Sequence, residues 1–164
     1  MIKLLVLDVD GCMTDGKIIY DNNGLESKQF NVKDGLGITS WLKLGNEIAI
    51  ITGRDSCIVA NRAKELGIKH LYQGVKDKQA RLKELVESLH IGFNEVAAIG
   101  DDLNDYHMLR LVGHSFTPAN GLKEIQKMVT TVLSKEGGDG AVREMIDILI
   151  DKNKQRDQFM AVWI

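Results

Sequence analysis

The stretch Leu4-Leu5-Val6-Leu7-Asp8-Val9-Asp10-Gly11 decides the fold of this chain. It opens with four apolar residues, a pattern typical of a strand that is buried on both faces of a parallel sheet. Side chains alternate along a strand, so Asp8 and Asp10 point the same way where this strand ends. Two like charges repel unless a cation or a shared proton holds them together. Mg²⁺ would supply that charge, and the two carboxylates could then serve as nucleophile and proton-transfer group.

An acidic turn that only ends a core strand is the alternative, because Asp and Gly are ordinary turn residues. Three further motifs favour a site. Thr52-Gly53-Arg54 follows a second apolar strand, Lys78 opens a helix, and Gly100-Asp101-Asp102 follows another strand. Ligands of a doubly wound sheet bind beyond the carboxyl ends of its strands. We therefore expect the residues at these strand ends to converge on one place.

Strands and helices alternate along the chain, which predicts an α/β fold with a doubly wound, mostly parallel sheet. The expected strands cover residues 4–7, 47–52, 70–72, 95–99, 114–117 and 129–133, and the expected helices cover 34–44, 55–66, 76–89, 102–112, 122–128 and 141–150. Two short extended runs around an Asn-Gly turn predict a β-hairpin flap over residues 17–32. No Pro- or Ser-rich linker divides the chain, so we expect one domain over residues 1–164.

Two segments near the end of the chain carry separate expectations. Residues 137–140 read as a loop in which Asp139 caps the last helix. The tail over residues 151–164 ends in apolar side chains that solvent-exposed tails do not normally carry. We expect this tail to dock, and another subunit is one surface that it could cover.

Bulk composition narrows the class of protein. The chain has 164 residues, 44% hydrophobic and 27% charged, which is normal for a soluble globular domain. A formal net charge of -2 gives no electrostatic case for binding nucleic acid or an anionic membrane. No apolar run is long enough to span a bilayer, and no cleavable signal is evident. Cys12 and Cys57 have no metal-site spacing and form no disulfide framework, so cytoplasm is the expected location.

The ordered set of motifs resembles the four motifs of the haloacid dehalogenase superfamily of phosphohydrolases. This resemblance implies that Asp8 attacks phosphorus to give an aspartyl-phosphate. Asp10 would protonate the leaving alkoxide and later deprotonate the attacking water. Mg²⁺ would be held by the Asp8 carboxylate, the Asp10 main-chain carbonyl and the Asp101 carboxylate. Asp102 and Asp105 would either support these ligands or cap the following helix.

The remaining motifs would bind the phosphoryl group. The resemblance implies that Thr52 and the Gly53 amide donate to phosphoryl oxygens and that Lys78 balances the charge developing on them. Each has an ordinary alternative, because a Thr-Gly pair is most often only a turn and a lone helical lysine is usually solvated. Helical spacing places Arg62 beside an apolar stripe, where it either snorkels at the edge or points into a site.

At a finer level the whole chain resembles the family of cap-less 3-deoxy-D-manno-octulosonate 8-phosphate phosphatases. The flap, residues 30–38, Ile51-Thr52-Gly53-Arg54 and residues 137–144 carry this resemblance. It implies a phosphoric monoester hydrolase of lipopolysaccharide precursor synthesis that forms homotetramers in which a neighbour helps to close each site. It also implies substrate contacts from Asn31, Val32, Lys33, Asp34, Gly35, Arg54, Arg62 and Asn104. One departure is Thr39, where many members carry arginine.

Three alternatives are weighed against this hypothesis. A phosphatase of the same subfamily acts on 2-keto-3-deoxy-nononate 9-phosphate, but its members tend to carry Glu where this chain has Arg54. A phosphorylatable receiver module keeps its acceptor at the end of the third strand, and here that strand, residues 70–74, has no Asp. An idle partner domain of a sugar-nucleotide enzyme would not be expected to keep every motif residue.

Overall fold

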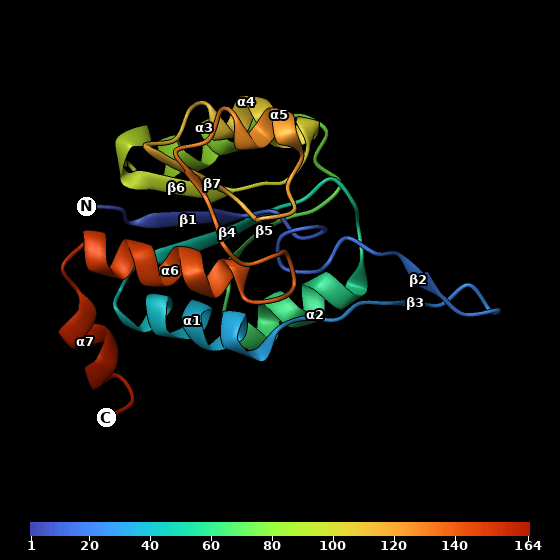
Figure 1. Cartoon of the computed structure of the whole chain (residues 1–164), viewed down its shortest axis with the longest axis horizontal. Helices are drawn as coiled ribbons and strands as arrows, with labels where there is room; N and C mark the ends of the chain where they lie inside the picture. Colours follow the sequence, from blue (N-terminus) through green and yellow to red (C-terminus); the bar gives the residue numbers. More distant parts are fainter.

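A computed structural model describes residues 1–164, and its centre is a six-stranded sheet in the order β5-β4-β1-β6-β7-β8 (Figure 1). Every neighbouring pair in this sheet is parallel. The strands are β1 (Leu4–Leu7), β4 (Glu47–Ile51), β5 (His70–Tyr72), β6 (Val96–Ile99), β7 (His114–Thr117) and β8 (Thr131–Val132). The chain builds one half of the sheet outward from β1 and then returns to build the other half from β6. This topology confirms the predicted doubly wound sheet.

Helices cover both faces of the sheet (Figure 1). One layer contains α1 (Val32–Lys43), α2 (Cys57–Leu66) and α6 (Ala141–Lys152), and the other contains α3 (Lys78–Ser88), α4 (Tyr106–Leu109) and α5 (Lys123–Gln126). Because alternate residues of β1 face opposite layers, Leu5 and Leu7 join the core on the α1–α6 side, and Leu4 and Val6 join the core on the α3 side. All four are completely buried, as their sequence pattern predicts.

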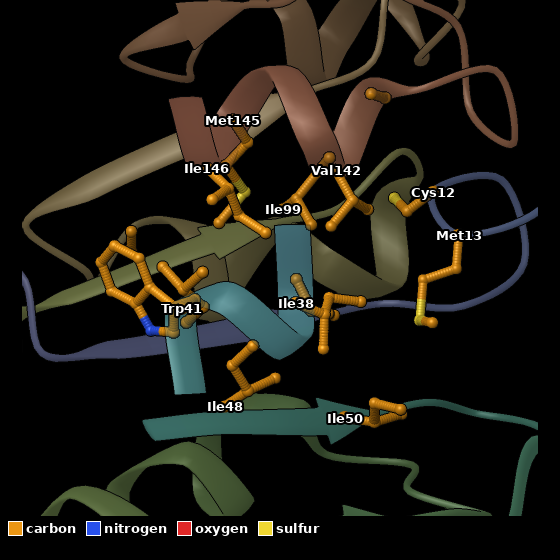
Figure 2. Packing of buried hydrophobic residues seen from close by; sticks show 14 of the residues in the cluster. Cys12, Met13, Ile38, Trp41, Ile48, Ile50, Ile99, Val142, Met145 and Ile146 are labelled. Atoms are coloured by element: carbon orange, nitrogen blue, oxygen red, sulfur yellow. The ribbon is translucent and has the colours of Figure 1, made fainter. Parts of the chain in front are cut away.

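The larger core lies between the sheet and the α1–α6 pair. Trp41 and Ile38 of α1 meet Met145 and Ile146 of α6 above the apolar side chains of the sheet (Figure 2). Trp41 is fully buried, and its indole Nε1–H donates to the Glu47 carbonyl at 3.1 Å. The ring therefore fills the core without leaving a polar atom unpaired.

Local side chains fix where the helices begin. Asn31 accepts a hydrogen bond from the Lys33 amide at 2.8 Å and so caps α1. Ser56 and Asp77 cap α2 and α3 in the same way. Such caps satisfy amides that have no partner within the helix. They hold the first turn of each helix at the edge of the sheet where the polar motifs gather.

The predicted flap is a small antiparallel hairpin of β2 (Ile19–Tyr20) and β3 (Glu26–Ser27). It projects away from the body of the domain as a separate arm, and no cap domain is present (Figure 1). Ile18, Ile19, Tyr20 and Leu25 expose 41 to 66% of their surface on this arm. That is a concentration of apolar surface on a short two-stranded unit, which is marginally stable by itself.

Two expectations about helix ends are wrong. The helix expected over 102–112 is instead a 3-10 turn, η2 (Leu103–Asp105), followed by the short α4, because the Asp105 side chain folds back onto the backbone amides of Asp101 and Asp102. Asp139 does not cap α6; Gly140 occupies the cap position with a φ of 96° and offers no side chain. A second short 3-10 turn, η1 (Phe93–Glu95), leads into β6.

The C-terminal tail docks on its own domain. After α6 the chain turns into α7 (Arg156–Ala161), whose Phe159 is buried against the larger core. The Trp163 indole donates to Ser40 Oγ at 2.8 Å, and Lys43 Nζ lies 4.1 Å from the centre of its ring. The tail therefore docks only in part on α1 and α6, because Met160, Trp163 and Ile164 remain 44 to 90% exposed. None of the helices combines the length and the apolar composition needed to cross a membrane.

Candidate active site

A polar cavity of about 270 Å³ lies at the carboxyl edge of the sheet, where the strand order reverses between β1 and β6. This is the position at which doubly wound sheets bind ligands. None of its lining residues is hydrophobic. The cavity brings together eight of the residues expected in the site, and Gly16 completes its wall: Asp8, Asp10, Thr52, Gly53, Arg54, Asp101, Asp102 and Asn104.

Asp8 is anchored from below by a buried lysine. Lys78 Nζ lies 2.6 Å from Asp8 Oδ1 and 2.6 Å from Asp105 Oδ1, and its side chain is 1% exposed. Burial alone would lower the pKa of Lys78, but the negative charges of Asp8 and Asp105 outweigh it and hold that pKa above its ordinary value. Lys78 is therefore a fixed cation beneath the nucleophile expected from the sequence. It lies behind Asp8 and does not line the cavity.

Asp105, not Asp102, is the buried carboxylate of this cluster. Its side chain is fully buried, bonds to Lys78, and accepts from the amides of Asp101 and Asp102 at 3.0 and 3.4 Å. Asp102 is exposed to the cavity and caps the η2 turn through the Leu103 amide. The sequence predicts a supporting or capping role for both acids, because local spacing does not show which of them turns inward.

The charges around Asp8 do not balance within the chain. If Asp8, Asp101 and Asp105 are all ionised, the single ammonium of Lys78 leaves two negative charges uncompensated. Burial, with the charges of neighbouring acids, raises the pKa of Asp8 to about 8 and that of Asp101 to about 6. Oxygen ligands with a deficit of two positive charges suit a divalent hard cation such as Mg²⁺.

A thiol lies beside the same carboxylates. The Cys12 sulfur is 4.0 Å from Asp101 Oδ1, and the potential ligand atoms of Asp8, Cys12 and Asp101 all lie within 4.8 Å of one another. Burial, followed by the nearby negative charges, raises the pKa of the Cys12 thiol well above its ordinary value. Cys12 therefore stays a neutral, buried group, and the charge at the site comes from the carboxylates.

The turn after β1 requires glycine. Gly11 has a φ of 94°, and a Cβ at this position would run into the Asp101 carboxylate. Gly137 packs equally closely against the Gly11 carbonyl, and the Gly138 amide donates to the Cys12 carbonyl at 3.1 Å. The glycine-rich loop before α6 therefore supports the turn that carries Asp10.

The flap reaches the site through residues that the sequence did not single out. Lys28, directly after β3, has a 1% exposed side chain and lies 2.5 Å from Asp10 Oδ1. Glu26 lies 3.0 Å from Arg54 Nη1. A glutamate in a two-residue strand and a lysine directly after it carry no local signal of this placement, because only the return of the flap toward residues 10 and 54 brings them there.

The other expected substrate residues do not line this cavity. Asn31, Val32 and Lys33 line a second one, of about 530 Å³, between the start of α1 and α6. Asp34 accepts from the Arg143 amide at 2.8 Å and thereby caps α6, while its second oxygen is buried without a partner. Desolvation raises the pKa of Asp34 to about 6.

Arg62, a further expected substrate contact, and Thr39, the departure from the family, both have partners within the chain. Arg62 bonds to Glu65 at 2.9 Å and covers the ring of Phe30, with its guanidinium against Gly35. Thr39, where family members often carry arginine, donates to the Leu36 carbonyl within its own helix at 3.0 Å. The substrate contacts expected of residues 31–35 and of Arg62 stay predictions.

The fold is that of a haloacid dehalogenase-like hydrolase, and the family model of that description matches residues 71–146. A relative from Escherichia coli strain K12, named 3-deoxy-D-manno-octulosonate 8-phosphate phosphatase, is 45% identical over 91% of this chain and 79% of its own length. One from Yersinia pestis with the same name is 43% identical over 91% of this chain and 80% of its own. The chain belongs to this phosphatase family.

Solved structures agree with the sequence relatives. The phosphatase of this name from Moraxella catarrhalis, determined with magnesium ion, phosphate ion and a KDO molecule, superposes with a TM-score of 0.96 and 42% identity over 99% of this chain and 94% of its own. A cobalt-bound phosphatase from Haemophilus influenzae superposes with a TM-score of 0.89 and 37% identity over 94% of this chain and 91% of its own.

Proposed function

We propose that this protein is a Mg²⁺-dependent phosphatase that hydrolyses 3-deoxy-D-manno-octulosonate 8-phosphate to the free sugar acid and phosphate, in lipopolysaccharide precursor synthesis. The observation that carries this proposal is the convergence of Asp8, Asp10, Thr52 and Asp101 on one polar cavity, with Lys78 fixed under Asp8. Membership of the family supports the substrate.

In the first step Asp8 is the nucleophile. Lys78 holds Asp8 Oδ1 at 2.6 Å, so the carboxylate cannot rotate freely and its other oxygen attacks phosphorus. The bond from phosphorus to the sugar oxygen breaks as the bond to Asp8 forms, which gives an aspartyl-phosphate. Asp10, on the same wall of the cavity, donates a proton to the departing alkoxide and becomes a carboxylate.

The second step returns the enzyme to its starting state. Asp10 takes a proton from a water molecule as that water attacks phosphorus, and the bond between phosphorus and Asp8 breaks. Free phosphate leaves, Asp8 is again a carboxylate, and Asp10 again carries the proton. One group therefore acts first as acid and then as base without a net change.

The phosphoryl oxygens carry the charge that develops in both steps. Thr52 and the Gly53 amide lie at the cavity wall, where they can donate to these oxygens. Lys78, behind Asp8, offsets part of the negative charge that develops on them. Asp8, the Asp10 carbonyl and Asp101 would hold Mg²⁺, which would neutralise the two excess negative charges and polarise a phosphoryl oxygen.

The substrate also carries a sugar carboxylate, which calls for cationic contacts. Arg54 and Asn104 line the cavity and are positioned to bind the sugar acid near the phosphoryl site. We further infer a homotetramer, because the apolar flap residues would be covered by neighbouring copies, and a cytoplasmic location, which suits two free cysteines. Light scattering after gel filtration tests the subunit number.

The deciding experiment is phosphate release in Mg²⁺ from the eight-carbon and the nine-carbon keto-sugar phosphates, with Asp8→Asn as control. We expect strong preference for the eight-carbon substrate and no turnover by Asp8→Asn. Preference for the nine-carbon acid would be consistent with the mechanism, but it would show that Arg54 does not indicate an eight-carbon substrate. Turnover that survives Asp8→Asn would overturn the mechanism.

A further inference from the structure

Lys28 is a buried cation that belongs to the flap yet contacts the proton-transfer group. Its side chain is 1% exposed, and its Nζ lies 2.5 Å from Asp10 Oδ1 and 3.2 Å from Glu26 Oε1. An ammonium removed from water is costly unless carboxylates surround it. The acidic side chains of Asp10 and Glu26 do so here, so the ammonium has one well-defined position. From that position it holds the Asp10 side chain through one oxygen, Oδ1.

The same glutamate connects Lys28 to the cavity arginine. Glu26 Oε1 lies 3.0 Å from Arg54 Nη1, and Arg54 Nη2 donates to the Tyr20 hydroxyl at 3.2 Å. Asp10, Lys28, Glu26 and Arg54 thus form a chain in which acidic and basic side chains alternate. Both ends of the chain line the cavity, and its two central members come from β3 and the residue after it.

We propose that Lys28 is a positioning residue for Asp10, through which the flap sets the geometry of the proton-transfer step. Lys28 occupies Oδ1, so Oδ2 of Asp10 is the oxygen that exchanges a proton with the leaving group. The inference rests on the proposed phosphatase function. Lys28 does not line the cavity, which separates this role from binding of the substrate.

The leaving group distinguishes positioning of the acid from general damage. An alkoxide leaves phosphorus only with a proton, whereas a nitrophenolate leaves without one, so a misplaced acid slows the first reaction alone. The parameter to compare is kcat/KM, because it reports the steps up to release of the leaving group and not the later hydrolysis of the aspartyl-phosphate.

The test uses the full chain with Mg²⁺ and three variants, Lys28→Met, Lys28→Arg and Lys17→Met. Lys17 is the matched control, because it lies on the flap but its side chain is 79% exposed and meets only Asp15. For Lys28→Met we expect kcat/KM to fall about 100-fold for the eight-carbon sugar phosphate and less than about threefold for 4-nitrophenyl phosphate. The kcat/KM of Lys28→Arg for the sugar phosphate should be about tenfold higher than that of Lys28→Met. The kcat/KM of Lys17→Met should match that of the unmodified protein.

A second measurement keeps binding apart from positioning. Calorimetric affinity for the sugar phosphate is measured in Asp8→Asn and in Asp8→Asn/Lys28→Met, and we expect agreement within about threefold. An affinity loss as large as the kcat/KM loss, or equal kcat/KM losses for both leaving groups, would overturn the proposal. If Lys28→Met does not fold by circular dichroism, Lys28→Gln carries the same comparison. Failure of the unmodified protein to hydrolyse either ester would refute the phosphatase function itself.

Discussion

Lys78 supplies the sharpest test of the electrostatic argument. Its Nζ is bonded to Asp8 and Asp105, and none of the three side chains is more than 7% exposed. Lys78→Met removes the cation and leaves both carboxylates in place. Removal of one partner from a buried ion pair costs about 3–5 kcal/mol of unfolding free energy.

The structure also limits this loss and predicts its pH dependence. The folded variant can escape the uncompensated charge by protonating one further carboxylate, which costs about 1.36 kcal/mol for each pH unit above the ordinary carboxyl pKa of 3.8. The loss of unfolding free energy in Lys78→Met therefore cannot exceed about 4 kcal/mol at pH 7 and about 2 kcal/mol at pH 5. The difference in unfolding free energy between the unmodified protein and Lys78→Met should therefore become smaller as the pH falls.

Urea unfolding followed by circular dichroism, in EDTA at pH 5 and pH 7, measures both quantities. Lys76→Met is the matched control, because Lys76 is exposed two residues earlier and forms no ion pair. Phosphate release should also fall by at least about 100-fold in Lys78→Met. A loss below about 1 kcal/mol at pH 7, or a deficit that is equal at both pH values, would refute the assignment of Lys78 as the compensating charge.

Two further predictions concern the metal and the turn after β1. Because the pKa values of Asp8 and Asp101 are raised to about 8 and about 6, the metal-free folded state retains protons that the unfolded chain has lost, and its stability should fall as the pH rises from about 4 to 8. Mg²⁺ competes with those protons, so its increase in Tm should be larger at pH 8 than at pH 5; an increase independent of pH would contradict the site. Gly11→Ala should lower phosphate release by more than about 100-fold, since its Cβ would displace Asp101. Gly24→Ala is its control, because Gly24 has a φ of 79° but open space around it. Equal phosphate release by the two variants would show that displacement of Asp101 does not affect catalysis.

The acid cluster shows where sequence reasoning ends. Spacing after β6 placed Asp101, Asp102 and Asp105 near the site, but it did not show that Asp105 turns inward to Lys78 while Asp102 faces the cavity. The choice depends on the 3-10 turn that replaces the expected helix, and that turn exists because Asp105 satisfies two backbone amides. Which acid is buried is therefore decided by packing and not by local pattern.

The sequence by itself determined the parallel sheet, the flap and the order of the motifs. These follow from hydrophobic periodicity and from the positions of glycine and acidic residues at strand ends, which are properties of short segments. It also placed Asp8, Thr52 and Asp101 at one edge, because parallel strands share a carboxyl edge.

Only the tertiary structure decided which partners those residues meet. Lys78 reaches Asp8 across 70 positions of the chain, Lys28 returns to Asp10 from the flap, and Asp34 caps α6 from α1. Such contacts depend on how elements pack and on which buried charges must be paired. No short segment of sequence contains that information, because each partner alone looks like an ordinary solvated residue.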